Sequence, residues 1–148
     1  NELLDQPALT TDVIVGFPEE TDEEFEQTRE AVEQIGFSKI HTFPFSPRRG
    51  TPAAEMKGQI PRAIKRQRSA ELRILEEKMR QQYFSSLLGR ELNVLVESAT
   101  EGRIQGTAGR YVPVESAGRE SQLGQLVPLT AESLAGDRLM ATGHQQPR

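Results

Sequence analysis

The hydrophobic pattern changes its period at about residue 90 of the 148-residue chain. Before that point, short β-branched runs alternate with stretches in which apolar side chains recur every three or four residues, the spacing of helices. After it, apolar and polar residues alternate in short segments separated by Gly, Ser and acidic residues, which is typical of strands. The pattern therefore predicts an α/β part followed by a β part.

The N-terminal pattern predicts a strand–helix–strand unit. Residues 12–16 (DVIVG) form an apolar run typical of a strand buried on both faces, and residues 39–46 (KIHTFPFS) are rich in β-branched and aromatic side chains. Between them, Thr21 and Glu24 have the spacing of a capping box, and Gly36 is placed to end the helix in a left-handed turn. Such a crossover connects parallel strands with right-handed topology.

One long helix is predicted next, because Pro61 suits its first turn and Gly89 its end. Six apolar residues form its stripe: Ile64, Leu72, Leu75, Met79, Tyr83 and Leu87. Five basic residues lie mostly off this stripe: Lys65, Arg66, Arg68, Arg73 and Arg80. So narrow a stripe on so long a helix favours a connector between two bodies.

The patterns together divide the chain into four parts. Residues 1–58 hold the strand–helix–strand unit and a Pro/Gly-rich loop, and residues 59–89 form the connecting helix. Residues 90–143 are predicted to form a small antiparallel β-barrel of the oligonucleotide-binding-like kind, and residues 144–148 a tail.

Composition narrows the possible chemistry. There is no cysteine, which excludes disulfides and iron–sulfur ligation within these residues. The two histidines, His41 and His144, lie far apart and do not favour a metal site of the chain's own. No apolar run approaches the ~20 residues that a membrane span needs. We expect a cytoplasmic protein without a membrane partner and, because Asn1 stands almost directly before a strand, a piece of a longer one.

Charge is distributed unevenly along the chain. Residues 1–36 contain eleven acids and one arginine, whereas residues 37–90 contain twelve Lys or Arg and four acids. Residues 91–148 contain five arginines and seven acids. Only the middle region suits a polyanionic partner, and the ordinary alternative is a solvated basic helix face.

The stretch DVIVGFPEET, between the first strand and the first helix, is the main candidate for ligand contact. Gly16 ends a strand at the mouth of a parallel sheet, where bare backbone lets a ligand approach. Glu20 stands just before a helix, where its carboxylate can accept hydrogen bonds from a ligand amine or ribose. The alternative is a tight turn whose acid complements the helix dipole. No nucleophile with a nearby base is visible, so no catalytic residue is predicted.

Three stretches in a fixed order carry a family resemblance: TDVIVGFPEETDEEF, GFSKIHTFPFSPRRGTPAAEM and QIPRAIKRQR. They resemble the radical S-adenosylmethionine (SAM) methylthiotransferases, which modify tRNA or a ribosomal protein. The final β segment resembles the C-terminal TRAM domain of these enzymes, a small RNA-binding barrel. HTFPFSPRRGTPAA is most similar to the branch that acts on threonylcarbamoyl-adenosine beside the anticodon. The resemblance implies a C-terminal remnant of a partial (β/α) barrel, a connecting helix and a TRAM domain.

The resemblance also implies cofactors and binding residues. Seven residues would line or complete a SAM pocket: Val13, Val15, Gly16, Glu20, Phe43, Ser46 and Arg48. Two [4Fe–4S] clusters would be bound by the parent protein outside this chain, so we expect the chain alone to show no cluster and no SAM cleavage. The family usually has Gly where Glu19 stands and Pro where Arg49 stands, which puts the geometry of both turns in question.

The proposed partners are tRNA and the N-terminal part of the parent chain. Five residues are the predicted RNA contacts: Lys65, Arg66, Arg103, Arg110 and Tyr111. Other hypotheses remain at this point. The parent could act on isopentenyl-adenosine or on a ribosomal protein, or the chain could be a non-catalytic RNA-binding module or an interaction scaffold.

Overall fold

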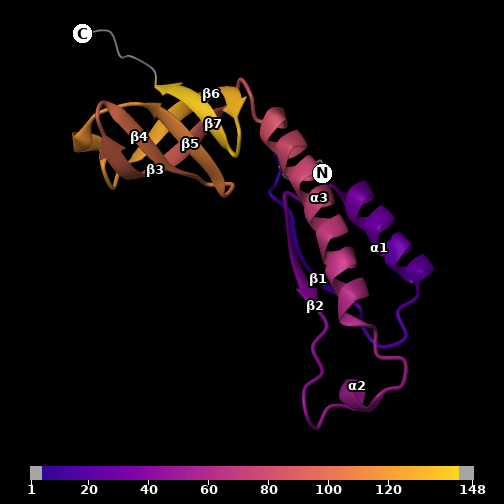
Figure 1. Ribbon diagram of the computed structural model, residues 1–148. Coiled ribbons are helices and arrows are strands. Elements are labelled where there is room, and N and C mark those ends of the chain that lie inside the picture. The colour runs from indigo at the N-terminus through magenta and orange to yellow at the C-terminus, as the bar shows by residue number, and fades with distance from the viewer. Residues whose placement is uncertain (1–4, 144–148) are drawn as a thin grey trace. The chain divides into compact units, whose positions relative to one another are not determined.

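The computed structural model describes residues 5–143 and divides them into two units (Figure 1). Residues 8–80 form the α/β unit, whereas residues 5–7 and 81–143 form the barrel unit. The boundary between the units falls within the long helix rather than at either of its ends. No helix in this described range combines the length and the apolarity that crossing a bilayer requires.

The α/β unit begins with the expected strand–helix–strand order. Strand β1 (Thr10–Val15) leads into helix α1 (Asp22–Ile35) and strand β2 (Lys39–Pro44). The two strands pair in parallel, from Thr10 opposite Lys39 to Val15 opposite Pro44, which confirms the predicted parallel pairing. A four-residue helix, α2 (Pro52–Glu55), lies in the segment predicted to be loop throughout.

Local signals define helix α1 as predicted. The amide of Glu24 donates to the Thr21 hydroxyl at 3.2 Å, and the amide of Thr21 donates to the Glu24 carboxylate at 2.8 Å. Gly36 has φ 73°, and its amide donates to the Val32 carbonyl at 3.2 Å. The capping box and the left-handed helix end are therefore confirmed.

The core of the α/β unit lies on one face of the two-stranded sheet. Val15 and Ile40 pack there against residues of both long helices: Phe25 and Val32 of α1, and Leu72, Leu75 and Met79 of α3 (Arg62–Ser86). Because successive strand residues point to opposite faces, Ile14 lies on the other face and is 57% exposed. The prediction of a strand buried on both faces is therefore wrong for the described residues, since both helices cover the same face.

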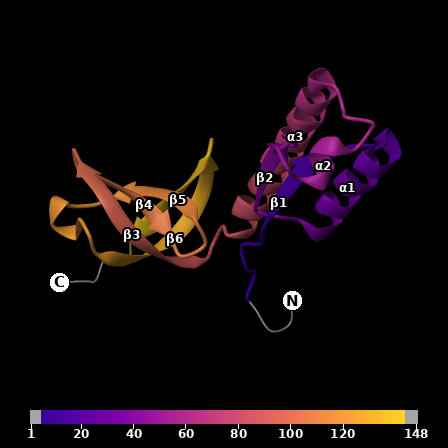
Figure 2. The ribbon, with the colours of Figure 1, turned by 90° about the horizontal axis from the view of Figure 1, so that it is seen from below.

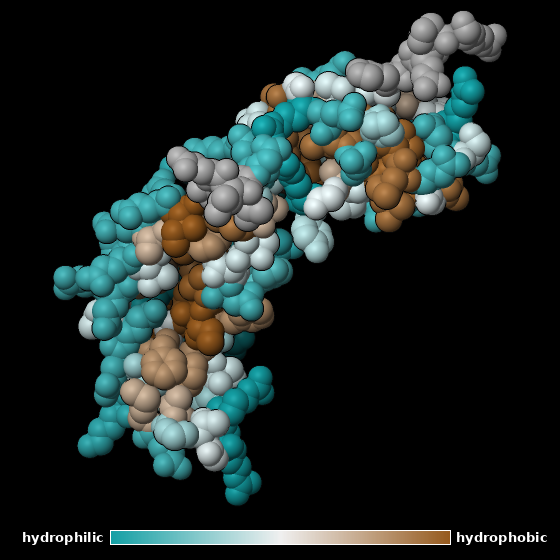
Figure 3. Space-filling model, turned by 180° about the vertical axis from the view of Figure 1, so that it is seen from behind, coloured by the Kyte–Doolittle hydropathy of each residue, from teal (hydrophilic) through white to brown (hydrophobic). Residues whose placement is uncertain are grey.

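The exposed face of the sheet carries large apolar side chains. Ile14 lies opposite Phe43 in the register, and both are exposed. Viewed from behind, a strip of hydrophobic residues runs along the α/β unit (Figure 3). We call Ile14 and Phe43 the open apolar face.

The barrel unit is built from the last turns of α3 and five strands, which curve round on themselves (Figure 2). The strands are β3 (Glu91–Thr100), β4 (Arg103–Ala108), β5 (Val112–Ala117), β6 (Leu126–Ala135) and β7 (Arg138–Gly143). A 3₁₀ turn (Glu120–Gln122) lies between β5 and β6. The closed order is β3-β4-β5-β7-β6, with β6 paired to β3.

The barrel is not fully antiparallel as predicted, because β5 and β7 pair in parallel. Strand direction cannot alternate all the way round a closed ring with an odd number of strands. At least one neighbouring pair in a five-stranded barrel must therefore be parallel, and here it is the pair that joins β7 to the earlier strands.

Alternating side chains fill the barrel. Val94, Val96, Ile104, Val112 and Leu139 are fully buried, and they pack with Phe84 of α3 and with Leu87, which directly follows that helix. Phe84 was not assigned to the apolar stripe of the helix. Gly106 marks a close crossing of strands, because a Cβ there would lie 1.9 Å from the Leu95 carbonyl oxygen.

Candidate functional site

The turn that follows β1 is held by its own glutamate. Gly16 has φ +70°, and its amide donates to Glu20 Oε2 at 2.5 Å. A Cβ at this position would lie 2.5 Å from Lys65 Cγ of α3, so a larger residue would meet both backbone strain and a clash. Gly16 is therefore required by the packing of the unit itself, whether or not a ligand approaches it.

Arg68, which the sequence pattern placed off the apolar stripe, is buried and paired with this turn. Its Nη1 donates to Glu20 Oε2 at 2.5 Å and to the Glu20 carbonyl at 3.2 Å, and its Nη2 donates to Asp22 Oδ1 at 2.7 Å. The Arg68 side chain is 4% exposed and that of Glu20 13%. The guanidinium also lies 5.3 Å from the centre of the Phe25 ring.

These contacts stabilise the charged form of the arginine. Burial works against the charged guanidinium, but hydrogen bonds to Asp22 and Glu20 outweigh it and hold the pKa of Arg68 above its ordinary value. A sequence signal for this role existed, because Arg68 stands four residues before Leu72 and seven before Leu75, on the buried side of the helix.

Glu19 adopts the backbone conformation that the family pattern reserves for glycine. Its φ is 70°, and its amide donates to the Gly58 carbonyl at 2.9 Å. The left-handed conformation costs an L-residue with a side chain roughly 1–2 kcal/mol. Glu19, in place of the usual glycine, therefore keeps the turn geometry at an energetic cost.

The structure separates the seven predicted SAM-site residues into different locations. Val13 and Val15 point into the core under the helices, so their observed contacts are packing contacts. Phe43 lies on the open apolar face, and Arg48 is exposed in the loop that follows β2. Gly16 and Glu20 form the turn described above, and the carboxylate oxygen Oε2 of Glu20 is already used by Gly16 and Arg68.

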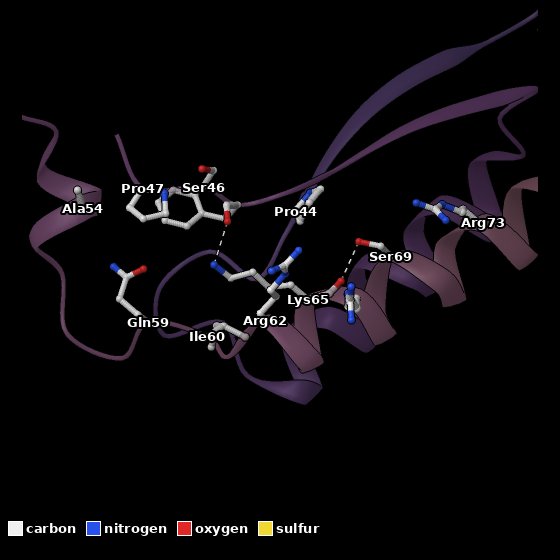
Figure 4. A pocket seen from close by; sticks show the side chains of 12 residues that line it. Pro44, Ser46, Pro47, Ala54, Gln59, Ile60, Arg62, Lys65, Ser69 and Arg73 are labelled. Atoms are coloured by element: carbon white, nitrogen blue, oxygen red, sulfur yellow. Dashed lines mark hydrogen bonds between the residues drawn. The ribbon is translucent and has the colours of Figure 1, made fainter. Parts of the chain in front are cut away.

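Ser46 instead lines a pocket of about 810 Å³ at the carboxyl end of β2, within the α/β unit (Figure 4). One wall is formed by Pro44, Phe45 and Pro47, and the opposite side by the first turns of α3. That helix contributes four cations: Arg62, Lys65, Arg66 and Arg73. The pocket therefore brings together Ser46, predicted for SAM, and Lys65 and Arg66, predicted for RNA.

In the barrel unit, the predicted RNA contacts differ in whether they already pair with groups of the protein. Arg103 donates to the carboxylate of Glu115, which also accepts from Arg138 at 3.2 Å. Burial raises the pKa of Glu115, but its hydrogen bonds to Arg138 and Arg103 outweigh this and leave the pKa lowered.

Two adjacent residues of the β4–β5 turn differ in whether their side chains already have partners. Arg110 donates to Asp5 Oδ2 at 3.0 Å and to the Gln6 carbonyl at 2.6 Å. Tyr111 is 83% exposed and adopts φ 57°, so its ring stands free at the turn. Of the predicted contacts in the barrel unit, Tyr111 is therefore the one whose side chain is most exposed to a partner.

No group of three or more His, Asp or Glu side chains within residues 5–143 is arranged to hold a metal ion.

Comparison with known proteins identifies relatives. A search against models of protein families gives no match. The chain is 40% identical over 146 residues to tRNA-2-methylthio-N(6)-dimethylallyladenosine synthase 1 of Mycobacterium marinum, covering 92% of the chain and 28% of that protein. It is 38% identical over 138 residues to a threonylcarbamoyladenosine tRNA methylthiotransferase of Thermotoga maritima, covering 90% of the chain and 31% of that protein.

A third relative is more similar over a shorter stretch. The tRNA-2-methylthio-N(6)-dimethylallyladenosine synthase of Kineococcus radiotolerans is 50% identical over 96 residues, which is 65% of the chain. The chain spans about three-tenths of the length of the first two relatives. It is therefore homologous to the tRNA methylthiotransferase family, and it matches a part of these enzymes along nine-tenths of its own length.

Proposed function

We propose that the chain is the C-terminal portion of a tRNA methylthiotransferase, which adds a methylthio group to C2 of an N6-modified adenosine beside the anticodon. The homology along nine-tenths of the chain carries this proposal. A tRNA substrate would place the work of the parent protein in the cytoplasm.

The α/β unit would contribute one wall of a SAM site. SAM would supply both the radical that starts the reaction and the methyl group that is transferred. The described residues fit such a ligand, because Phe43 on the open apolar face can contact an adenine ring, and the exposed Arg48 follows in the loop after β2. Arg48 would pair with a carboxylate through its two-pronged guanidinium.

The other residues predicted for the SAM site would support this wall rather than contact the ligand. Val13 and Val15 hold β1 against the helices, and Glu20 holds the Gly16 turn through its carboxylate. The chain has no cysteine for an iron–sulfur cluster, so both clusters of the parent are assigned to residues outside it.

The barrel would be a TRAM-type module that binds the anticodon arm of tRNA. Its closed five-stranded topology and the exposed ring of Tyr111 support this role, because an aromatic ring stacks on an unpaired base. Arg103 and Arg110 would exchange their carboxylate partners for RNA phosphates, and Lys65 and Arg66 would add contacts from α3.

Two modified adenosines are candidate substrates. The SPRRGTPAA stretch favours the threonylcarbamoyl form, whereas the 50% identity to the Kineococcus radiotolerans enzyme favours the dimethylallyl form named for that relative. The nucleoside that loses its methylthio group when the gene is deleted will decide between them.

Equilibrium dialysis of SAM with the full-length parent protein tests the enzyme proposal. We expect binding that Phe43→Ala weakens at least severalfold, whereas Lys39→Ala, an exposed change at the other end of β2, leaves it unaltered. Binding of tRNA by a full-length protein that takes up no SAM would instead favour a non-catalytic RNA-binding module.

A further inference from the structure

The pocket at the carboxyl end of β2 carries positive charge that the described protein leaves uncompensated. Within residues 5–143, no carboxylate forms an ion pair with Arg62, Arg66 or Arg73, and no acidic residue lines the pocket. Other cations of the same unit do have partners: Arg68 pairs with Glu20, and Lys78 with Glu33. Within α3, the cations without a carboxylate partner therefore lie on the side that faces the pocket.

The opposite wall of the pocket is apolar and held in position. The Phe45 amide donates to the Val15 carbonyl at 2.8 Å, and its ring lies 5.1 Å from that of Phe17 in an edge arrangement. Lys65 Nζ donates to the Phe45 carbonyl at 2.9 Å and lies 5.2 Å from the centre of the ring. Lys65 therefore fixes this wall (Figure 4), while the three arginines that line the pocket remain available for a ligand.

The end of the pocket near α2 is also fixed by hydrogen bonds. The Gln59 side-chain amide donates to the Ala53 carbonyl at 3.0 Å and to the Met56 carbonyl at 3.2 Å. These bonds close the loop around α2, whose Ala54 lines the pocket. The volume of about 810 Å³ lies in the range of sites for small organic ligands.

The charge of the lining selects the class of ligand. A sulfonium or ammonium group would meet arginines and no carboxylate, which is unfavourable. A phosphate would find several guanidinium donors, which bind phosphate oxygens in pairs. An apolar wall beside the phosphate site suits the face of a base. The lining thus favours a nucleotide over SAM.

We propose that this pocket binds one nucleotide of an RNA strand, with its phosphate at Arg62, Arg66 and Arg73 and its base against Pro44 and Phe45. The assignment of the strand to RNA rests on the proposed function, whereas the nucleotide chemistry rests on the pocket alone. The pocket is thereby a phosphate-binding subsite separate from the exposed ring of Tyr111 on the barrel.

Calorimetric titration of the 148-residue chain with AMP and with adenosine tests the nucleotide chemistry. We expect AMP to bind at least about tenfold more tightly than adenosine, because only AMP carries a phosphate. The double variant Arg62→Gln/Arg73→Gln should weaken AMP binding about tenfold or more and change adenosine binding little. Equal affinity for AMP and adenosine, or no binding of AMP, would overturn the proposal.

A charge-matched control separates the pocket from general electrostatics. The variant Lys57→Gln/Arg119→Gln removes the same charge from two exposed residues outside the pocket and should change AMP affinity less than about twofold. An equal loss in this control and in the pocket variant would overturn the pocket assignment. Circular dichroism of both variants establishes that each retains its fold.

Competition with single-stranded RNA decides the source of the nucleotide. We expect an oligoadenylate to displace AMP, and AMP that stays bound in its presence would overturn the RNA assignment. Binding of tRNA to the variants distinguishes failure of the pocket proposal from failure of the proposed function. If tRNA binding depends on Tyr111 but not on Arg62 or Arg73, the barrel proposal stands and the pocket proposal is refuted.

Discussion

Arg68 Nη1 lies 2.5 Å from Glu20 Oε2, although the two residues are 48 positions apart in the chain. This buried pair ties helix α3 to the turn after β1, and the same carboxylate oxygen accepts the Gly16 amide. Because a charge that loses its partner in such a site is poorly solvated, the pair has a large effect when only one side is removed.

We expect Arg68→Gln to destabilise the α/β unit by about 3 kcal/mol, because it leaves the Glu20 carboxylate without its cationic partner. Urea unfolding followed by helical circular dichroism measures the change. Lys78→Gln is the matched control on the same helix, since its pair with Glu33 is half exposed on both sides and should contribute less than about 1 kcal/mol. Equal effects of the two variants would refute a special role for Arg68.

Replacing Glu19 by glycine should relieve backbone strain and stabilise the α/β unit. Because Glu19 has φ 70°, we expect Glu19→Gly to raise the unfolding free energy by about 0.5–1 kcal/mol, after subtraction of the entropy that glycine adds to the unfolded chain. Glu23→Gly, in the first turn of α1, should instead lower it by roughly 0.5–1 kcal/mol. A loss of stability in Glu19→Gly would show that the side chain of Glu19 contributes more than its strain costs.

The ion pairs of Glu115 make the barrel unit sensitive to acid. The pKa of Glu115 is lowered in the folded state, so its stabilising contribution is present above its unfolded value of about 4.5 and is lost as pH falls through the lower folded value. Thermal unfolding between about pH 6 and pH 3 should therefore show a smaller decline in Glu115→Gln than in the unchanged chain. Glu97→Gln is the control, and an unchanged decline in Glu115→Gln would contradict the role of this carboxylate.

Tyr111 should contribute stacking to RNA binding. We expect Tyr111→Ala to weaken tRNA binding about tenfold in a filter-binding titration, because stacking of a base on an aromatic ring contributes about 1–3 kcal/mol. Tyr111→Phe retains the ring and should bind within about twofold of the unchanged chain. A similar loss in both variants would point to the hydroxyl group rather than to stacking.

Local signals in the sequence predicted the elements whose partners are close in the chain. The capping box of Thr21 and Glu24 and the turn at Gly36 lie within single helix ends, and spacing alone indicates them. The pairing of Arg68 with Glu20 joins segments that are distant in the chain. The only sequence signal for it was the helical spacing between Arg68 and the apolar residues of α3.

Features that depend on how many elements pack together were harder to predict. Ile14 is exposed because both helices cover the opposite face, and the composition of the strand does not contain that information. The odd number of strands in the closed ring requires at least one parallel pair but does not determine that this pair is β5 and β7. The pocket depends on the loop after β2 lying beside the first turns of α3, two segments that no local pattern in the sequence brings together.

Mass spectrometry of tRNA nucleosides tests the central claim most directly. In cells that lack the gene for the parent protein, we predict that one N6-modified adenosine loses its methylthio group and keeps its N6 substituent, and that the intact gene restores it. Unchanged methylthio-adenosine content in these cells would contradict the assignment of the chain to a tRNA methylthiotransferase activity.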